Sequence, residues 1–261
     1  MIPKTIHYCW FGCNPKPESV LKCIDSWKKY CPDYEIIEWN ESNFDIAANR
    51  YCREAYEAKK WAFATDYARL WIVYRYGGIY LDTDVEVVRP LEPLLRHRCF
   101  IGRQPGFQVN TGSGFGAEAG HPLIARMLAD YERIPFVLEN GQLDLWTCPH
   151  RNSQWLLNNG MELEDTYQEI AGAAIYPVEY FSPLDAYTRK LRRTENTYSI
   201  HHCDATWNPD ETDLEKKRRY WKYRYLEARD WIAHIPNRLI RSVLGDKMYN
   251  AIKERLKGRL K

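Results

Sequence analysis

The sequence predicts an α/β domain built on a mostly parallel central sheet flanked by helices. Residues 2–11 alternate and then become apolar, residues 17–30 show a helical pattern, and residues 34–39 again resemble a strand. A strand, a helix and a strand in this order are typical of a parallel sheet, because the helix carries the chain back to the edge where the first strand began. We therefore expect one α/β domain over residues 1–210 and a helical tail over residues 211–261.

The middle of the chain continues the alternation of helices and strands. Helical patterns cover residues 46–58 and 60–76, and the Gly77-Gly78 pair stands where a helix end favours a left-handed residue. An apolar strand follows, ends in Asp82-Thr83-Asp84 and resumes at Val85. Shorter elements complete the domain: strands over 99–102, 173–178 and 198–202, a strand or loop over 109–115, and helices over 121–138 and around 155.

The tail carries the positive charge of a chain whose net charge is only +2. Residues 211–261 contain 15 Lys and Arg against 7 Asp and Glu, interleaved with aromatic side chains. This pattern suits an anionic membrane surface, although nucleic acid would use the same charges and a helical face packed on the domain is a third interpretation. We expect the tail to bind the inner membrane surface, without a nucleic-acid partner.

The cellular compartment is indicated by two features of the sequence. No apolar run reaches the ~20 residues that a membrane-spanning helix needs, and the chain starts with a strand pattern rather than a signal-peptide core. The eight cysteines include no CxxC pair, so we interpret them as free and mostly buried thiols in a reducing compartment. We expect a cytoplasmic protein, peripheral on the cytoplasmic face of a membrane.

Asp82 and Asp84 are the first candidate functional residues. If the strand continues through them, both side chains point to one face, because side chains alternate along a strand. Two carboxylates that close together are unfavourable unless a cation or protons lie between them, and a divalent ion with oxygen ligands meets this need. Ligands of parallel α/β sheets also bind at the carboxyl ends of strands. The pair therefore predicts a divalent-metal site.

Asp66 and Arg69 stand three residues apart on the predicted helix over 60–76, so they share one face of it. The surrounding residues are almost all apolar or aromatic, and charges on such a helix are expected to be buried and to need partners. An arginine that contacts a phosphate or sugar and an aspartate that accepts from hydroxyls would fit. A local ion pair of little net value is the alternative.

The run His201-His202-Cys203-Asp204 does not fit a zinc site, because adjacent strand residues point to opposite faces and no second ligand pair follows at a suitable spacing. One of the two histidines can still complete a metal site around Asp84. A structural histidine is the alternative.

Three motifs in this order resemble glycosyltransferase family 32: Ile-Pro-Lys-Thr-Ile-His-Tyr-Cys-Trp-Phe-Gly at 2–12, Ala-Thr-Asp-Tyr-Ala-Arg at 64–69 and Gly-Gly-Ile-Tyr-Leu-Asp-Thr-Asp at 77–84. The resemblance is dense over residues 1–90 and recurs at 110–122 and 199–207. The family groups yeast-type mannosyltransferases with bacterial capsular polysaccharide glycosyltransferases and is related to the glucosylating clostridial toxins. It implies a GT-A fold, a divalent metal, usually Mn²⁺ (or Mg²⁺), a nucleotide-sugar donor and transfer with retention.

The resemblance also implies roles for individual residues. Asp84 would bind the metal, Asp82 the ribose and metal-bound water, and Asp66 and Arg69 the donor sugar, so that Asp66, Arg69 and Asp84 form the expected catalytic set. The further implied contacts are nucleobase stacking by Trp10, donor-sugar hydroxyls at Asn110, a late metal ligand at His202 with His201 as the alternative, and the diphosphate near Thr206 and Trp207.

The function that follows is metal-dependent, retaining transfer of a hexose from a UDP-sugar such as UDP-galactose to a lipid-linked oligosaccharide in capsule, exopolysaccharide or O-antigen synthesis. GDP-mannose is the alternative donor. Nucleotidyl or phosphoryl transfer would predict a phosphate-cradling glycine motif, and the sequence contains no P-loop pattern. A non-enzymatic divalent-ion or carbohydrate-binding module would leave Trp10, Asp66 and Arg69 without a role.

Overall fold

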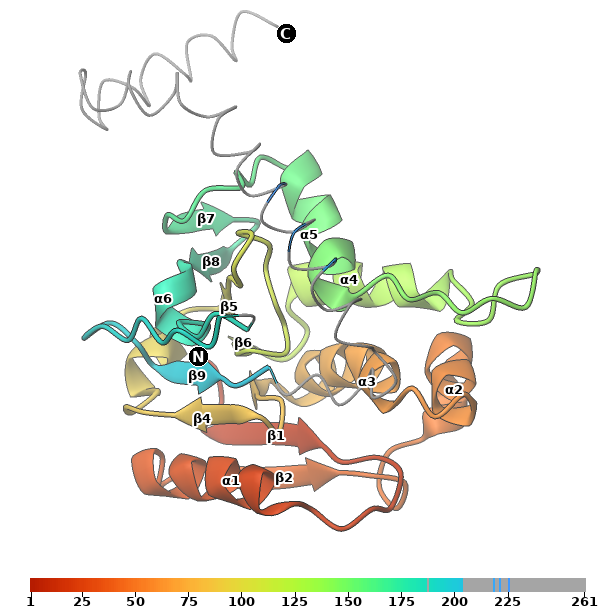
Figure 1. The fold of residues 1–261 in the computed structure, drawn as a ribbon, viewed down its shortest axis with the longest axis horizontal. Helices are drawn as coiled ribbons and strands as arrows, with labels where there is room; N and C mark the ends of the chain where they lie inside the picture. The colour runs from red at the N-terminus through yellow and green to blue at the C-terminus, as the bar shows by residue number, and fades with distance from the viewer. Residues whose placement is uncertain (187, 204–217, 219–220, 222–224, 226–261) are drawn as a thin grey trace, which may run out of the picture. The chain divides into compact units, whose positions relative to one another are not determined.

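A computed structural model describes residues 1–186 and 188–203, together with the single positions 218, 221 and 225 (Figure 1). The chain divides into two units, Met1–Pro209 and Asp210–Lys261, and we describe the first. The predicted basic tail over 211–261 lies outside the described residues except for those three positions, so the domain boundary and the tail remain predictions. No helix within the described part is long and apolar enough to span a membrane.

The chain opens with the predicted parallel β-α-β unit. Strand β1 (Thr5–Cys9), helix α1 (Glu18–Tyr30) and strand β2 (Glu35–Trp39) follow one another. The two strands pair in parallel from Thr5 opposite Glu35 to Cys9 opposite Trp39. Helix α1 places the buried Trp27 against the later strand β4, where its indole nitrogen donates to the carbonyl of Val85 at 2.7 Å.

The helical patterns over 46–58 and 60–76 are confirmed as a 3₁₀ turn, η1 (Ile46–Ala48), and two helices, α2 (Arg50–Glu57) and α3 (Trp61–Tyr76). Helix α3 is buried along most of its length. Gly77 ends it with a φ of 68°, as the sequence predicts, and strand β3 (Gly78–Tyr80) begins at the next residue. Buried polar groups on α3 therefore need partners inside the protein.

The central sheet has seven strands in the order β2-β1-β3-β6-β5-β8-β7. Its remaining strands are β5 (Cys99–Gly102), β6 (Phe115–Ala117), β7 (Gln168–Ile170) and β8 (Ala173–Tyr176). Strands β6 and β7 run antiparallel to their neighbours, and the other five share one direction. The expected mostly parallel α/β sheet with flanking helices is thus confirmed.

Helices cover both faces of this sheet (Figure 1). Adjacent strand residues face opposite cores: Ile79 packs with residues of α1, and Tyr80 packs with residues of α2 and α3. The other helical elements are η2 (Glu92–Arg96), α4 (Pro122–Glu132), α5 (Cys148–Asn158) and α6 (Val178–Phe181). Two buried cores therefore hold the strand that leads into Asp82.

The strand expected to run through Asp82-Thr83-Asp84 is interrupted, and this part of the prediction is wrong. Strand β3 ends at Tyr80, and the three residues lie in a turn in which the amide of Val85 donates to the carbonyl of Asp82 at 3.0 Å. The chain then forms β4 (Val85–Val87), which pairs with β9 (Ser199–His201) in a separate two-stranded antiparallel sheet. A turn, rather than the alternation of a strand, brings the two carboxylates together.

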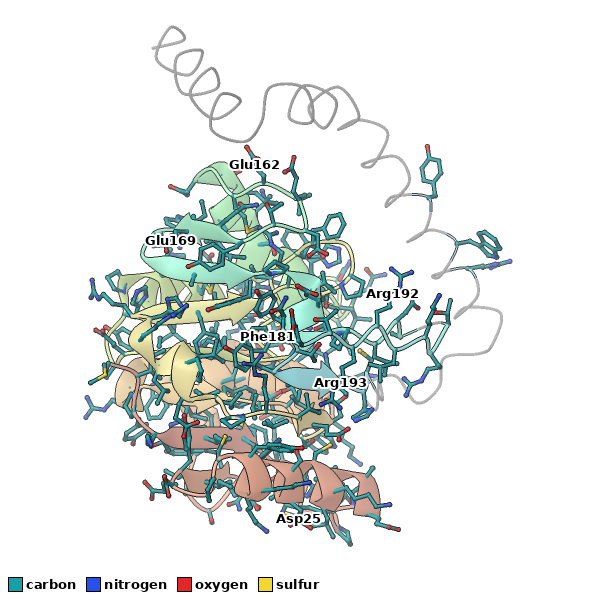
Figure 2. The ribbon with its side chains drawn as sticks, turned by 90° about the vertical axis from the view of Figure 1, so that its left-hand side faces the viewer. Asp25, Glu162, Glu169, Phe181, Arg192 and Arg193 are labelled. Atoms are coloured by element: carbon teal, nitrogen blue, oxygen red, sulfur yellow. The ribbon has the colours of Figure 1, made fainter. Side chains whose placement is uncertain are left out.

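The two-stranded sheet is supported from behind by α6. Phe181 of α6 lies in the interior beside β9 (Figure 2). Its ring stacks on Phe100 of β5 at 5.7 Å and on Tyr198, just before β9, at 5.9 Å. The amide of Tyr198 also donates to the carbonyl of Tyr180 at 2.8 Å. Strand β9, and His201 at its end, is thereby fixed relative to the central sheet.

Candidate active site

Helix α3 supplies the buried pair Asp66 and Arg69. Nη2 of Arg69 lies 3.1 Å from Oδ1 of Asp66 and 3.3 Å from Oδ1 of Asp82. The guanidinium also donates to Thr65, through Nε to the carbonyl at 3.1 Å and through Nη2 to Oγ1 at 3.0 Å. The expectation that charges on this helix are buried and find internal partners is confirmed, and Arg69 connects α3 to the turn that holds Asp82.

Burial and neighbouring charges shift the pKa values of Asp66 and Arg69 in opposite directions. Burial raises the pKa of Asp66 to about 6, although the charge of Arg69 opposes this shift. Burial alone would lower the pKa of Arg69, but Asp82 and Asp66 outweigh it and hold that pKa well above the ordinary value. Arg69 is therefore a permanent cation at this site, whereas Asp66 can carry or lose a proton near neutral pH.

The turn after β3 and the end of β9 bring Asp82, Asp84 and His201 together. Each offers one ligand atom, and the three atoms lie within 4.8 Å of one another. Nε2 of His201 lies 3.2 Å from Oδ1 of Asp84. Burial raises the pKa of Asp82, and the neighbouring charge of Asp84 adds to the shift against the opposing charge of Arg69. Two acids held this close form a site that favours an added positive charge.

His201 and not His202 joins this group. The ring of His202 lies beside Glu86, with Nε2 at 3.1 Å from Oε2, while its backbone amide donates to the carbonyl of Asp84 at 2.9 Å. Neighbouring residues at the end of a strand point to opposite sides, so only one of two adjacent histidines can face the acids. The geometry therefore favours His201, the alternative, over His202 as the late metal ligand.

The group fits a divalent metal ion. Carboxylate oxygens suit Mn²⁺ and Mg²⁺, and an imidazole nitrogen is a poorer partner for Mg²⁺ than for transition metals. Asp82 and Asp84 would hold the ion through oxygen and His201 through Nε2. The donor set of two carboxylates and one imidazole thus favours Mn²⁺ over Mg²⁺ among the two expected ions.

Asn110 lies in the loop between β5 and β6 and reaches the same site. Its Oδ1 accepts from the amide of Gly112 at 2.7 Å, and its Nδ2 donates to Oε1 of Gln104 at 3.0 Å. Gly112 packs so closely that a Cβ there would stand 2.7 Å from Nη1 of Arg69 and 3.1 Å from Oδ1 of Asn110. Its carbonyl accepts from the amide of Asp82 at 3.0 Å, so this loop, Arg69 and Asp82 form one packed unit.

Helix α5 contributes residues that the sequence did not single out. Sγ of Cys148, the first residue of α5, lies 3.8 Å from Nη1 of Arg69 and 4.0 Å from Oδ1 of Asn110. Further along, Asn152 donates to Oγ1 of Thr111 at 3.0 Å, and Ser153 accepts from the amide of Val109 at 2.9 Å. The only local signal was Pro149 after Thr147-Cys148, a pattern typical of a helix start.

The other expected donor-binding residues are less closely tied to this centre. Trp10 follows β1, so it stands at the same edge of the sheet as Asp82, which follows the neighbouring strand β3. Its indole nitrogen donates to the carbonyl of Asn14 at 2.7 Å, and Nζ of Lys16 lies 5.8 Å from its ring centroid. Thr206 and Trp207 lie outside the described residues.

Comparison with known proteins identifies the region that contains the acids. Residues 17–101 match the family described as the glycosyltransferase sugar-binding region containing a DXD motif. Inositol phosphoceramide mannosyltransferase 3 of Schizosaccharomyces pombe is 34% identical over 140 residues, covering 52% of this chain and 38% of that protein. Human alpha-1,4-N-acetylglucosaminyltransferase is 24% identical over 147 residues, covering 56% and 39%. The chain thus spans less than half the length of these relatives.

Solved structures of glycosyltransferases also align with the chain. The PaToxG glycosyltransferase aligns with a TM-score of 0.46 and 20% identity, covering 60% of this chain and 69% of that one. The galactosyltransferase LgtC aligns with a TM-score of 0.44 and 16% identity, covering 86% and 95%. The matched region 17–101 contains Asp66, Arg69, Asp82 and Asp84, so these four residues lie in the part of the chain that is similar to DXD-motif glycosyltransferases.

Proposed function

We propose that this protein transfers a hexose from a nucleotide-sugar donor to an acceptor hydroxyl, with retention of configuration and with a bound divalent metal. The observation that supports this proposal is that Asp82 connects the buried pair Asp66 and Arg69 to the cluster of possible metal ligands. Asp82 pairs with Arg69 at 3.3 Å and also belongs to the cluster with Asp84 and His201. A cation site for a diphosphate thus adjoins a buried charged pair suited to sugar hydroxyls.

Each residue has a distinct task in this proposal. Asp82, Asp84 and His201 hold the metal, which when bound offsets negative charge on the departing diphosphate. Asp66 accepts hydrogen bonds from hydroxyls of the donor sugar, and Arg69 orients Asp66 and adds positive charge. Asn110, in the loop between β5 and β6, contacts the same sugar through its side-chain amide. Trp10, Thr206 and Trp207 remain proposed contacts for the nucleobase and the diphosphate.

We assign a front-side displacement to the transfer step. The bond from the anomeric carbon to the diphosphate oxygen breaks, and the bond to the acceptor oxygen forms on the same face of the sugar. The acceptor proton passes to the departing diphosphate. Asp66, the carboxylate that we place at the donor sugar, is held by Arg69 at 3.1 Å, which favours its role as a hydrogen-bond acceptor over that of a nucleophile.

Two donors are candidates. A UDP-hexose such as UDP-galactose follows from the resemblance to bacterial polysaccharide enzymes, whereas GDP-mannose is favoured by the relatives that are mannosyltransferases. Their names also specify an inositol phosphoceramide, which is a lipid, and this supports a lipid-linked acceptor. For this chain we propose a lipid-linked oligosaccharide of capsule, exopolysaccharide or O-antigen synthesis.

A donor-hydrolysis panel tests the function. UDP- and GDP-sugars are incubated with the protein in Mn²⁺, in Mg²⁺ or in EDTA, and released nucleoside diphosphate is measured. We expect one donor to be consumed with Mn²⁺ and none with EDTA. If every donor remained intact with both metals, or if EDTA left the rate unchanged, the proposal would be wrong.

We further propose that residues 211–261 hold the protein at the cytoplasmic face of a membrane. The support is the excess of eight positive charges among interleaved aromatic residues in this segment. Deletion of residues 212–261 should release the protein from anionic vesicles in a sedimentation assay and leave donor hydrolysis largely intact. Equal sedimentation of the full and the shortened chain would contradict the proposal.

A further inference from the structure

The side of the site formed by α5 carries an exposed aromatic surface that the proposed donor contacts do not use. We define the aromatic ledge as Leu145, Trp146 and His150. Leu145 is 53% exposed, Trp146 is 48% exposed, and His150 is exposed as well. The rings of Trp146 and His150 stack at 26° with centroids 6.5 Å apart. Large apolar side chains that gather on a surface in this way indicate a binding site.

The aromatic ledge is joined by a short piece of chain to Cys148, a neighbour of Arg69. Trp146 stands two residues before Cys148, and the thiol of Cys148 lies 3.8 Å from Nη1 of Arg69. Two residues of extended chain span at most about 7 Å, so the start of the ledge is close to the charged pair. The other terminal nitrogen of Arg69, Nη2, contacts Asp66 and Asp82. Arg69 therefore lies between two regions. The aromatic ledge is on the side of α5, and the proposed metal ligands are on the side of β4 and β9.

The support beneath the ledge is rigid and polar. Arg151 pairs with Asp144 at 2.7 Å, and its guanidinium carbon lies 5.3 Å from the centroid of Trp146 and 5.5 Å from that of Tyr131. Arg151 is 8% exposed, yet its Nε has no hydrogen-bond partner among the described residues. The buried guanidinium thus holds the ring of Trp146 from below, and Asp144 and His150 supply polar groups at the border of the ring.

We propose that the aromatic ledge is the acceptor subsite and that it binds the terminal pyranose of the acceptor. The C–H face of the sugar ring packs on Trp146, and the ring hydroxyls reach the polar groups at its border, Asp144 and His150. Aromatic side chains with a few polar groups are the usual lining of such sites. This inference rests on the proposed glycosyl transfer, because a transferase has to place an acceptor hydroxyl beside the donor sugar at Asp66.

A membrane is the less suitable occupant of this surface. Leu138 is also exposed on the same segment, so an apolar contact with lipid has to be considered. Residues 134–149 contain Glu139 and Asp144 but no Lys or Arg, and the nearby cation Arg151 is buried and paired with Asp144. An anionic membrane surface attracts cations and repels such a segment. A neutral sugar carries no such penalty.

A binding experiment that needs no turnover tests the subsite. Methyl α- and β-glycopyranosides of galactose, glucose, mannose and N-acetylglucosamine are added to the full chain, and bound glycoside is detected by saturation-transfer NMR. UDP or GDP with Mg²⁺ is present to fill the donor side, because Mg²⁺ is diamagnetic and does not broaden the NMR signals of a nearby glycoside. We expect at least one glycoside to bind the parent and Trp146→Ala to weaken it about tenfold, the factor that corresponds to 1.4 kcal/mol.

Two variants control for misfolding and for general surface effects. Trp146→Phe keeps an aromatic ring and should retain most of the binding. Tyr167→Ala removes a ring that is 46% exposed near β7 and should change nothing. Donor hydrolysis is measured in parallel and should stay within about twofold of the parent in Tyr167→Ala, a difference well under 1.4 kcal/mol.

The outcomes separate this inference from the proposed function. If glycosides bind and depend on Trp146 while no donor is hydrolysed, the ledge is supported and the transferase function is wrong. If donors are hydrolysed but Trp146→Ala binds glycosides as the parent does, or if no glycoside binds the parent, the inference is overturned. Loss of binding to anionic vesicles in Trp146→Ala, with glycoside binding unchanged, would assign the surface to a membrane instead.

Discussion

The site holds its carboxylates in two different ways. On α3, the side chain of Asp66 is 8% exposed and pairs with Arg69, whose side chain is 3% exposed and is anchored to Thr65. On the turn after β3, the side chain of Asp84 is 19% exposed and faces His201. His201 belongs to β9, which follows Asp84 by more than a hundred residues. We call the buried pair Asp66 and Arg69 the closed pair, and we call Asp82, Asp84 and His201, whose three ligand atoms lie within 4.8 Å of one another, the open cluster.

The two arrangements suit different tasks: the closed pair fixes the geometry of the site, and the open cluster is suited to bind a metal ion. A buried ion pair with its own hydrogen bonds fixes geometry, and breaking it is costly because it leaves an uncompensated buried charge. A partly exposed cluster of two acids and a histidine supplies the oxygen and nitrogen atoms that bind divalent metals. Asp82 belongs to both arrangements, since it contacts Arg69 and also offers an oxygen to the cluster.

Asp84→Asn should have the largest effect on activity. Replacing one carboxylate of the open cluster by an amide removes a proposed metal ligand without removing volume, so the fold should persist. We expect metal-dependent donor hydrolysis to fall by roughly 1000-fold, as is typical when a group that stabilises the transition state is lost. The rate is measured at saturating Mn²⁺, with circular dichroism to check the fold.

Glu86→Gln is the matched control for this change. Glu86 stands two residues after Asp84 but pairs with His202 at 3.1 Å on the other side of the strand. Its hydrolysis rate should remain near that of the parent. Equal losses in both variants would show that the acids act through general charge rather than through a metal site.

The closed pair should reveal itself in the pH dependence of stability. Burial raises the pKa of Asp66 to about 6, so between pH 4 and this value the folded protein keeps a proton that the unfolded chain loses. The stability from this group is therefore complete at low pH and is lost as pH rises through 6. A shift of this size corresponds to roughly 3 kcal/mol.

Urea unfolding of the parent and of Asp66→Asn between pH 4 and 7 measures this contribution. The difference in the free energy of unfolding between the two proteins should change by about that amount across the range. The variant lacks the titrating group, so its own curve gives the background from all other residues. A difference that stays constant with pH would show that Asp66 is ionised throughout and that Arg69 outweighs the effect of burial.

The two neighbouring histidines provide a sharper test of the open cluster. His201→Ala removes the ring that lies 3.2 Å from Asp84, and we expect the affinity for Mn²⁺ to fall 10- to 100-fold, a range typical of residues at metal sites. His202→Ala removes a ring that contacts Glu86 and should leave the affinity almost unchanged. Titration calorimetry measures both. The reverse order would return the ligand role to His202.

Local patterns were sufficient for the framework of this site. The β-α-β opening, the helix that ends at Gly77 and the two acids after an apolar strand depend on neighbours within a few residues. The need of Asp66 and Arg69 for internal partners also followed from local sequence, because their helix is apolar all round. Short-range periodicity and burial determine these features, so the sequence alone predicts them.

Features that depend on contacts between residues far apart in the sequence could not be predicted from local patterns. Alternation along a strand predicted that Asp82 and Asp84 face the same side, and they do meet, but through a turn. The choice between His201 and His202 depends on the register of β9 against β4, in which Val85 stands opposite His201. Cys148 reaches Arg69 only because α5 packs on the loop before β6. Contacts across this sequence separation leave no periodic signal.

The smallest effect is expected at the border of the closed pair. Tyr131 is fully buried near Asp66, and its hydroxyl has no hydrogen-bond partner among the described residues. Tyr131→Phe should therefore be neutral or stabilising by up to about 1 kcal/mol, since removing an unpaired buried polar group relieves its desolvation cost.

Tyr8→Phe is the matched variant, because the hydroxyl of Tyr8 donates to Glu38 at 2.6 Å, and it should destabilise the protein by about 1.5 kcal/mol. Thermal and urea unfolding measure both. If Tyr131→Phe destabilised as much as Tyr8→Phe, the hydroxyl would be a member of the Asp66 network, and the closed pair would extend further toward α4 than the contacts of Arg69 show.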